Sequence, residues 1–222
     1  MFLPFLKICG ITRRADALFC AEAGAGALGA VFYAKSPRNL SAVAARKLFL
    51  DLPPQIARVG IFVNATVDTM LRTARIAKLD TVQMHGEETV DKIAAVLREG
   101  LHVVQAIKRT GKGLLTAARA LPPGVGILVE CGRGALPGGT GTVWNWGQAA
   151  PLAQFRRFAI AGGLNAENIA TAARDSCAAG FDVSSGVELS PGIKDEAAIR
   201  AFMRAVRNLP APPHPFSWKG LP

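Results

Sequence analysis

Two ionisable side chains close short apolar runs in this sequence. Cys9 ends Phe-Leu-Lys-Ile-Cys, and Glu130 ends Gly-Ile-Leu-Val-Glu. A thiolate can remove a proton from carbon when nearby cations lower the pKa of the thiol. A carboxylic acid whose pKa is raised by desolvation can donate a proton. Cys9 and Glu130 are therefore a candidate base and acid, although a free cysteine is more often a packing residue and a glutamate at a strand end is often solvated.

Two glycine-rich segments suit an anion such as phosphate. Ala-Gly-Gly-Leu spans 161–164, and Ser-Ser-Gly-Val spans 184–187. Glycines allow backbone N–H groups to approach an anion closely. Each segment alone could be an ordinary turn, and the two together are a more specific signal. The candidate phosphate-binding residues are Gly162, Gly163, Ser184, Ser185 and Gly186.

Further polar features complete the set of candidates. Arg38 follows an apolar run, and the planar fork of its guanidinium suits a carboxylate. Asp182 lies near the end of another run. Gly-Gly-Thr-Gly at 138–141 lacks the Gly-Lys-Ser/Thr ending of a nucleotide P-loop, so we expect a mobile loop over the site instead. The histidines and cysteines have no metal-ligand spacing, so we expect no metal site.

Apolar strand-like runs alternate with helical stretches eight times, which predicts a parallel sheet built from βαβ units. The expected strands are 5–9, 28–32, 57–62, 81–84, 102–107, 126–130, 158–162 and 181–186. The expected helices are 13–23, 42–50, 67–77, 88–98, 114–120, 146–154, 166–173 and 195–207. Eight units favour a (β/α)8 TIM barrel, whose active site lies where the strands end. A doubly wound open sheet is the alternative, but no Gly-x-Gly-x-x-Gly follows the first run.

Length and charge narrow the class of protein further. The 222 residues suit one barrel domain over 1–209, followed by a proline-rich tail over 210–222 that we expect to be extended and partly ordered. The net charge of +10 comes from scattered lysines and arginines, so we expect no nucleic-acid partner, whereas a phosphorylated small molecule would be attracted. No apolar run is long enough to cross a membrane, and the dispersed cysteines favour free thiols in a reducing cytoplasm.

Seven short motifs, spread from about residue 7 to residue 207, resemble the phosphoribosylanthranilate isomerase family. Their order and spacing together are far more specific than any one of them. They are Lys-Ile-Cys-Gly-Ile-Thr (7–12), Lys-Ser-Pro-Arg (35–38), Val-Gln-Met-His-Gly-Glu-Glu (82–88), Gly-Gly-Thr-Gly (138–141), Ala-Gly-Gly-Leu-Asn (161–165), Phe-Asp-Val-Ser-Ser-Gly-Val-Glu (181–188) and Pro-Gly-Ile-Lys-Asp (191–195).

The resemblance implies an Amadori rearrangement without a cofactor, by a monomer or homodimer. Cys9 would be the base, and Glu130 stands where the family has an aspartate as the acid. Arg38 would bind the anthranilate carboxylate, Asp182 would contact the anthranilate end, and the two glycine-rich segments would hold the phosphate. Thr-Val-Trp-Asn-Trp at 142–146 also departs from the family's usual Lys-Thr-Phe-Asp-Trp. A related isomerase with another phosphosugar amine, or an inactive barrel that binds phosphorylated ligands, are therefore the alternatives.

Overall fold

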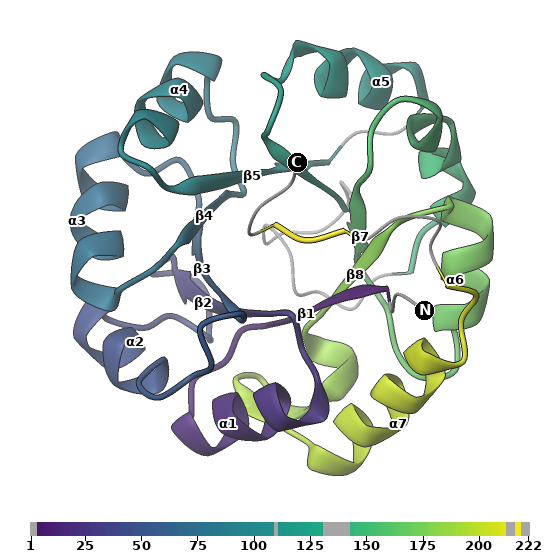
Figure 1. Ribbon diagram of the computed structural model, residues 1–222, viewed down its shortest axis with the longest axis horizontal. Helices are drawn as coiled ribbons and strands as arrows, with labels where there is room; N and C mark the ends of the chain where they lie inside the picture. The colour runs from purple at the N-terminus through teal and green to yellow at the C-terminus, as the bar shows by residue number, and fades with distance from the viewer. Residues whose placement is uncertain (1–3, 109–110, 131–142, 212–215, 219–222) are drawn as a thin grey trace.

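The computed structural model describes residues 4–108, 111–130, 143–211 and 216–218, and it confirms the expected barrel. Eight parallel strands pair in chain order, and β8 closes the ring against β1 (Figure 1). The strands are β1 (Phe5–Cys9), β2 (Ala27–Phe32), β3 (Ala57–Phe62), β4 (Thr81–Met84), β5 (His102–Ile107), β6 (Gly126–Val129), β7 (Ala159–Ala161) and β8 (Gly180–Val183).

Helices surround the barrel because the outward face of each strand is apolar and must be covered. They are α1 (Arg14–Ala23), α2 (Ala42–Leu48), α3 (Val67–Ala77), α4 (Val90–Arg98), α5 (Gly111–Ala120), α6 (Ile169–Ser176) and α7 (Glu196–Arg207). Side-chain oxygens of Ser41, Thr66, Thr89 and Asp195 accept hydrogen bonds from the first turns of four of these helices, which fixes where those helices begin. No helix among the described residues is both long and apolar enough to cross a membrane.

The structure departs from the sequence-based expectation at a few boundaries. The stretch 146–154 forms a 3-10 helix, η1 (Trp146–Gln154), which contains Pro151. The last strand stops at Val183, because the chain turns there into the short 3-10 helix η2 (Ser185–Val187). A two-stranded antiparallel hairpin, β9 (Glu188–Ser190) with β10 (Ile193–Lys194), follows and was not expected.

Strand alternation sends every second side chain into the barrel. Along β1 this places Phe5 in the interior apolar cluster, Lys7 against the inward-facing Asp182, and Cys9 in the pocket where the strands end. The intervening Leu6 and Ile8 pack in the second cluster, between the strands and the helices. Along the barrel axis β1 therefore supplies, in this order, the aromatic ring of Phe5, the buried charge of Lys7 and the candidate base Cys9.

Candidate active site

A pocket of about 730 Å³, including its open mouth, lies at the carboxyl ends of the strands. All nine residues singled out in the sequence line this one pocket: Cys9, Arg38, Glu130, Gly162, Gly163, Asp182, Ser184, Ser185 and Gly186. The segment 138–141 lies outside the described residues. The barrel therefore brings together groups that are far apart in the sequence, because parallel strands all end on the same face.

Cys9 sits at the mouth beside several positive charges. Burial raises the pKa of its thiol, Lys7 and Lys194 lower it, and Asp182 raises it. The net pKa lies above the ordinary thiol value, so burial outweighs the cations. The cations therefore lower the pKa of the Cys9 thiol but do not bring it below its ordinary value, and the thiol of the free protein is protonated at neutral pH.

Lys7 and Asp182 form a buried ion pair below Cys9. Lys7 Nζ donates to Asp182 Oδ2 at 2.7 Å, and the two side chains are 0% and 6% exposed. Burial lowers the pKa of Lys7, but Asp182 and Cys9 raise it above its ordinary value, so the ammonium stays charged. The other carboxylate oxygen of Asp182, Oδ1, is buried without a hydrogen-bond partner among the described residues. This oxygen is an unsatisfied acceptor in a residue that lines the pocket.

Glu130 is held by a histidine that the sequence did not assign to it. Its Oε2 lies 2.6 Å from Nε2 of His85, and Nδ1 of that ring lies 2.9 Å from the side-chain amide nitrogen of Gln83. An amide N–H donating to Nδ1 leaves the ring hydrogen on Nε2, directed at the carboxylate. All three side chains are buried at the pocket wall.

The pKa of Glu130 moves opposite to the expectation from the sequence. Burial raises the pKa of this carboxyl, but His85 and then Lys108 and Lys7 outweigh burial and hold it below its ordinary value. The carboxyl group of Glu130 is therefore ionised at neutral pH in the free protein.

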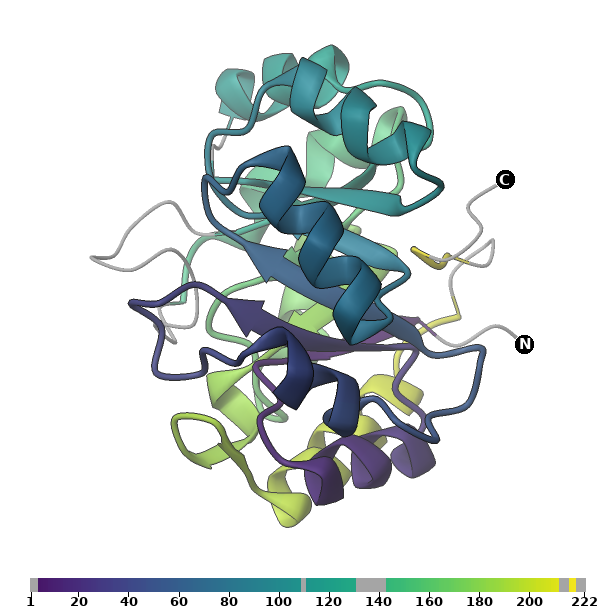
Figure 2. The same ribbon diagram turned by 90° about the vertical axis from the view of Figure 1, so that its left-hand side faces the viewer.

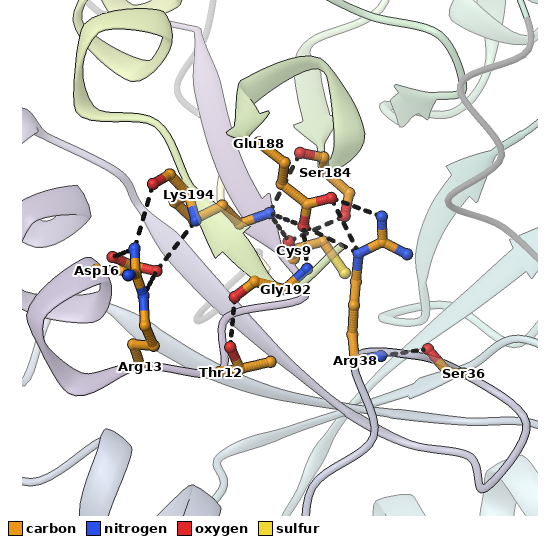
Figure 3. A network of polar contacts seen from close by, with 10 residues as sticks. All are labelled: Cys9, Thr12, Arg13, Asp16, Ser36, Arg38, Ser184, Glu188, Gly192 and Lys194. Carbon is orange, nitrogen blue, oxygen red and sulfur yellow. Dashed lines mark hydrogen bonds and ion pairs between the residues drawn. The ribbon is translucent and has the colours of Figure 1, made fainter. Parts of the chain in front are cut away.

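Arg38 is already paired in the free protein. Its Nε and Nη2 donate to the two carboxylate oxygens of Glu188, at 2.9 and 2.6 Å (Figure 3). Lys194 Nζ donates to Glu188 Oε1 at 2.8 Å and to the carbonyl oxygens of Cys9, at 2.6 Å, and Ser184, at 3.2 Å. Burial raises the pKa of Glu188, but Arg38 and Lys194 bring it below its ordinary value. The third guanidinium nitrogen of Arg38, Nη1, makes no hydrogen bond with the described residues.

Glycine is required where backbones approach closely around this network. Gly10 has a φ of +73°, and a Cβ built on it would lie 2.4 Å from Cδ of Arg38. A Cβ on Gly186 would lie 1.9 Å from the carbonyl oxygen of Leu164. The loops after β7 and β8 therefore pack backbone to backbone, which brings the two glycine-rich segments together at one end of the pocket.

Sequence reasoning did not assign roles to Lys7, Gln83, His85, Glu188 and Lys194. Lys7 and Gln83 could have been found, because each is a polar residue at an inward position of an otherwise apolar strand. Glu188 and Lys194 lie on the hairpin β9–β10, whose contact with Arg38 depends on the return of the chain from β8. No local pattern in the sequence reports that contact.

The fold and the site together define an enzyme-type barrel, with acid, base and anion-binding groups converging where its strands end. A family model for N-(5'-phosphoribosyl)anthranilate (PRA) isomerase matches residues 6–205. An N-(5'-phosphoribosyl)anthranilate isomerase of Pseudomonas fluorescens (strain SBW25) is 41% identical over 91% of this chain and 95% of that protein. The chain belongs to the N-(5'-phosphoribosyl)anthranilate isomerase family.

Solved structures agree with this membership. A phosphoribosylanthranilate isomerase in complex with reduced 1-(o-carboxyphenylamino)-1-deoxyribulose 5-phosphate has a TM-score of 0.82 and 34% identity. A structure of monomers generated from the dimeric enzyme of Thermotoga maritima has the same two values. In both comparisons 93% of this chain and 100% of the other are covered.

Proposed function

We propose that this isomerase converts N-(5'-phosphoribosyl)anthranilate to 1-(o-carboxyphenylamino)-1-deoxyribulose 5-phosphate, with Cys9 as the base and Glu130 as the acid. The observation that carries the assignment of roles is the convergence of Cys9, Glu130 and the two glycine-rich segments on one pocket. The acid protonates the ribose ring oxygen, and the ring C–O bond breaks to leave an iminium. The thiolate then takes the proton from the adjacent sugar carbon, and the resulting enolamine tautomerises to the ketone. The reaction belongs to tryptophan biosynthesis.

The protonation of the free site is the reverse of what these steps need. Cys9 is protonated and Glu130 is ionised, because their pKa values lie above and below the ordinary ones. The productive form has a thiolate at Cys9 and a proton on Glu130, so it contains the same number of protons as the free form. Substrate binding can therefore reach the productive form by moving a proton, without exchange with solvent.

The remaining candidates have polar groups suited to the parts of this substrate. Arg38 has Nη1 available for the anthranilate carboxylate, as its other two nitrogens are bound to Glu188. Asp182 Oδ1 can accept a hydrogen bond from the substrate amine or a hydroxyl group. Gly162, Gly163, Ser184, Ser185 and Gly186 would surround the phosphate.

According to this proposal the chain binds a phosphorylated small molecule, and it binds neither nucleic acid nor a membrane. We expect the chain to act as a monomer or a homodimer in the cytoplasm. Its basic charge raises the local concentration of an anionic substrate.

The test follows the fluorescence change as N-(5'-phosphoribosyl)anthranilate is consumed. Cys9→Ala should lower kcat by roughly two to four orders of magnitude, the usual contribution of a positioned base, with substrate binding retained. Cys20→Ala is the matched control, because Cys20 is buried in α1 and does not line the pocket. Near-normal turnover of Cys9→Ala would exclude Cys9 as the base. Tight binding of this substrate without any turnover by the unmodified chain would indicate another phosphosugar amine.

A further inference from the structure

The amino-terminal mouth of this barrel is lined by unusually small residues. The interior of such a barrel is normally filled by branched, bulky side chains. Here the first inward positions of five strands are Ala27, Ala57, Gly126, Ala159 and Gly180. Only Phe5 contributes a ring from this end of the strands to the interior cluster. These strands leave a space that their own side chains do not fill.

Two aromatic residues from the end of the chain occupy this space. Phe216 and Trp218 belong to the apolar cluster inside the barrel and are 7% and 2% exposed. The ring of Phe5 meets Phe216 edge-on, with 5.5 Å between centroids, and lies 5.1 Å from Trp218. Aromatic pairs at these separations are favourable beyond the area they bury.

The strand glycines match these rings closely. A Cβ on Gly126 would lie 3.0 Å from Cδ1 of Trp218, and a Cβ on Gly180 would lie 3.0 Å from Cε1 of Phe216. Larger side chains on β6 and β8 would therefore collide with the tail. The two glycines lack side chains where the two rings of the tail lie, so the strands and the tail fit each other.

The aromatic segment lies on the barrel axis, opposite the active site. Figure 1 shows the yellow segment crossing the middle of the ring of strands. Figure 2 shows it at the end away from the tips of the strand arrows. The match to the family model ends at residue 205, so this segment lies beyond the part of the chain that the family defines.

Trp218 also contacts the buried charge of the barrel. Lys7 Nζ lies 5.8 Å from the centroid of the Trp218 ring, and it donates to Asp182 at 2.7 Å. Cys9 follows two residues later on the same strand, toward the pocket. A charge sealed from water acts more strongly on its neighbours than a hydrated one. Among the charges near Cys9, Lys7 has the largest effect in favour of the thiolate.

We propose that the segment 216–218 is a plug that closes the amino-terminal mouth of the barrel, and that Trp218 is a positioning residue that keeps Lys7 dry beneath the Cys9 site. The indole nitrogen of Trp218 is buried without a hydrogen-bond partner among the described residues. Packing and the ring face, rather than a hydrogen bond, therefore hold Trp218 in place. Phenylalanine should consequently replace it with little loss, whereas alanine should open a path for water to Lys7.

The experiment measures the alkylation of Cys9 by iodoacetamide from neutral to alkaline pH, quantified on the Cys9 peptide by mass spectrometry. This readout reports the thiolate directly and does not require turnover, so its outcome does not depend on whether the proposed reaction takes place. The full-length variants are Trp218→Ala, Trp218→Leu and Trp218→Phe. Phe202→Ala is the control, because Phe202 is equally buried but belongs to the outer cluster between helices and strands.

In Trp218→Ala, Cys9 should be alkylated roughly 3- to 10-fold more slowly at a given pH below the thiol pKa, because weaker stabilisation by Lys7 reduces the thiolate fraction. Trp218→Phe should follow the unmodified profile. Trp218→Leu, which keeps the mouth apolar if the alanine variant fails to fold, should lie between them. Phe202→Ala should lower the melting temperature without moving the profile. An unchanged profile in both Trp218→Ala and Trp218→Leu, or an equal shift in Phe202→Ala, would overturn the proposal.

Discussion

The charges of the pocket are held in pairs, and one of these pairs lowers the pKa of the candidate acid, Glu130. Lys7 binds Asp182, Arg38 binds Glu188 and His85 binds Glu130. The carboxylate of Glu130 is within hydrogen-bonding distance of His85. The pKa of Glu130 consequently lies below its ordinary value, whereas burial raises the pKa of Cys9 above the ordinary thiol value.

This arrangement predicts an unusual pH dependence. The active and the free forms contain the same number of protons, so kcat/KM should be flat through the neutral range. It should fall at alkaline pH only above the ordinary thiol pKa of about 8.5, because the pKa of Cys9 is raised, and at acid pH only below the ordinary carboxyl pKa of about 4.3, because the pKa of Glu130 is lowered. Glu130→Gln removes the acid titration, so its much lower kcat/KM should instead rise about tenfold per pH unit toward alkaline pH, in step with the thiolate. A rate profile of the two proteins decides this, and the same shape in both would exclude Glu130 as the acid.

Arg38 gives a second prediction at this scale. Arg38→Met should weaken binding of an anthranilate-bearing ligand by about 2 kcal/mol, or about 30-fold, because a charge-assisted hydrogen bond is lost. Binding of inorganic phosphate should change much less, since the proposed phosphate site consists of backbone N–H groups of the glycine-rich segments. Isothermal titration with the two ligands makes the comparison. Equal losses for both would place Arg38 at the phosphate instead.

At the level of elements, the loops after β7 and β8 form one structural unit. Gly186 lies against the carbonyl oxygen of Leu164, and Asn168 Nδ2 donates to the carbonyl oxygen of Gly163 at 2.8 Å. The hairpin β9–β10 then returns Glu188 and Lys194 to Arg38, which follows β2. Strands β7 to β10 thus bring both glycine-rich loops and the partner of Arg38 to the pocket.

Gly186→Ala should disrupt this unit. Its Cβ cannot fit against Leu164, so the two loops must separate, and we expect affinity for inorganic phosphate to fall by roughly tenfold or more. Gly100→Ala is the control, because Gly100 has a φ of +77° with open space around it, so it loses stability through backbone strain alone. Phosphate titration together with thermal melting separates the two effects. Normal phosphate affinity in Gly186→Ala would place the phosphate away from these loops.

At the level of the whole molecule, the net charge of +10 affects how fast the anionic substrate reaches the protein and not the rate of the chemical step. The value of kcat/KM for the phosphorylated, carboxylated substrate should fall several-fold as salt is raised, since the Debye length is only about 8 Å at physiological ionic strength. The value of kcat should change little, because the charges of the pocket are buried and paired. Steady-state kinetics over a salt series test this, and a fall confined to kcat would contradict it.

Much of this protein was determined by the sequence alone. Continuous apolar runs alternating with helical stretches predicted the barrel, and the position of Cys9, Glu130 and Asp182 at or near strand ends placed them at one mouth. These inferences succeed because periodicity and strand polarity are local properties of the chain. The seven motifs likewise predicted the family, which the match over residues 6–205 confirms.

Only the tertiary structure decided the electrostatics and the closure of the barrel. Three contacts join residues that are far apart in the sequence. Glu130 and His85 are 45 positions apart, Arg38 and Glu188 are 150 apart, and Trp218 and Lys7 are some two hundred apart. Burial and distance determine a pKa, and neither can be read from a residue type, which is why the sequence could not give the directions in which the pKa values of Cys9 and Glu130 shift. The proline-rich tail gave no periodic signal of its own, and its rings became part of the core only because the strands opposite them carry glycine and alanine.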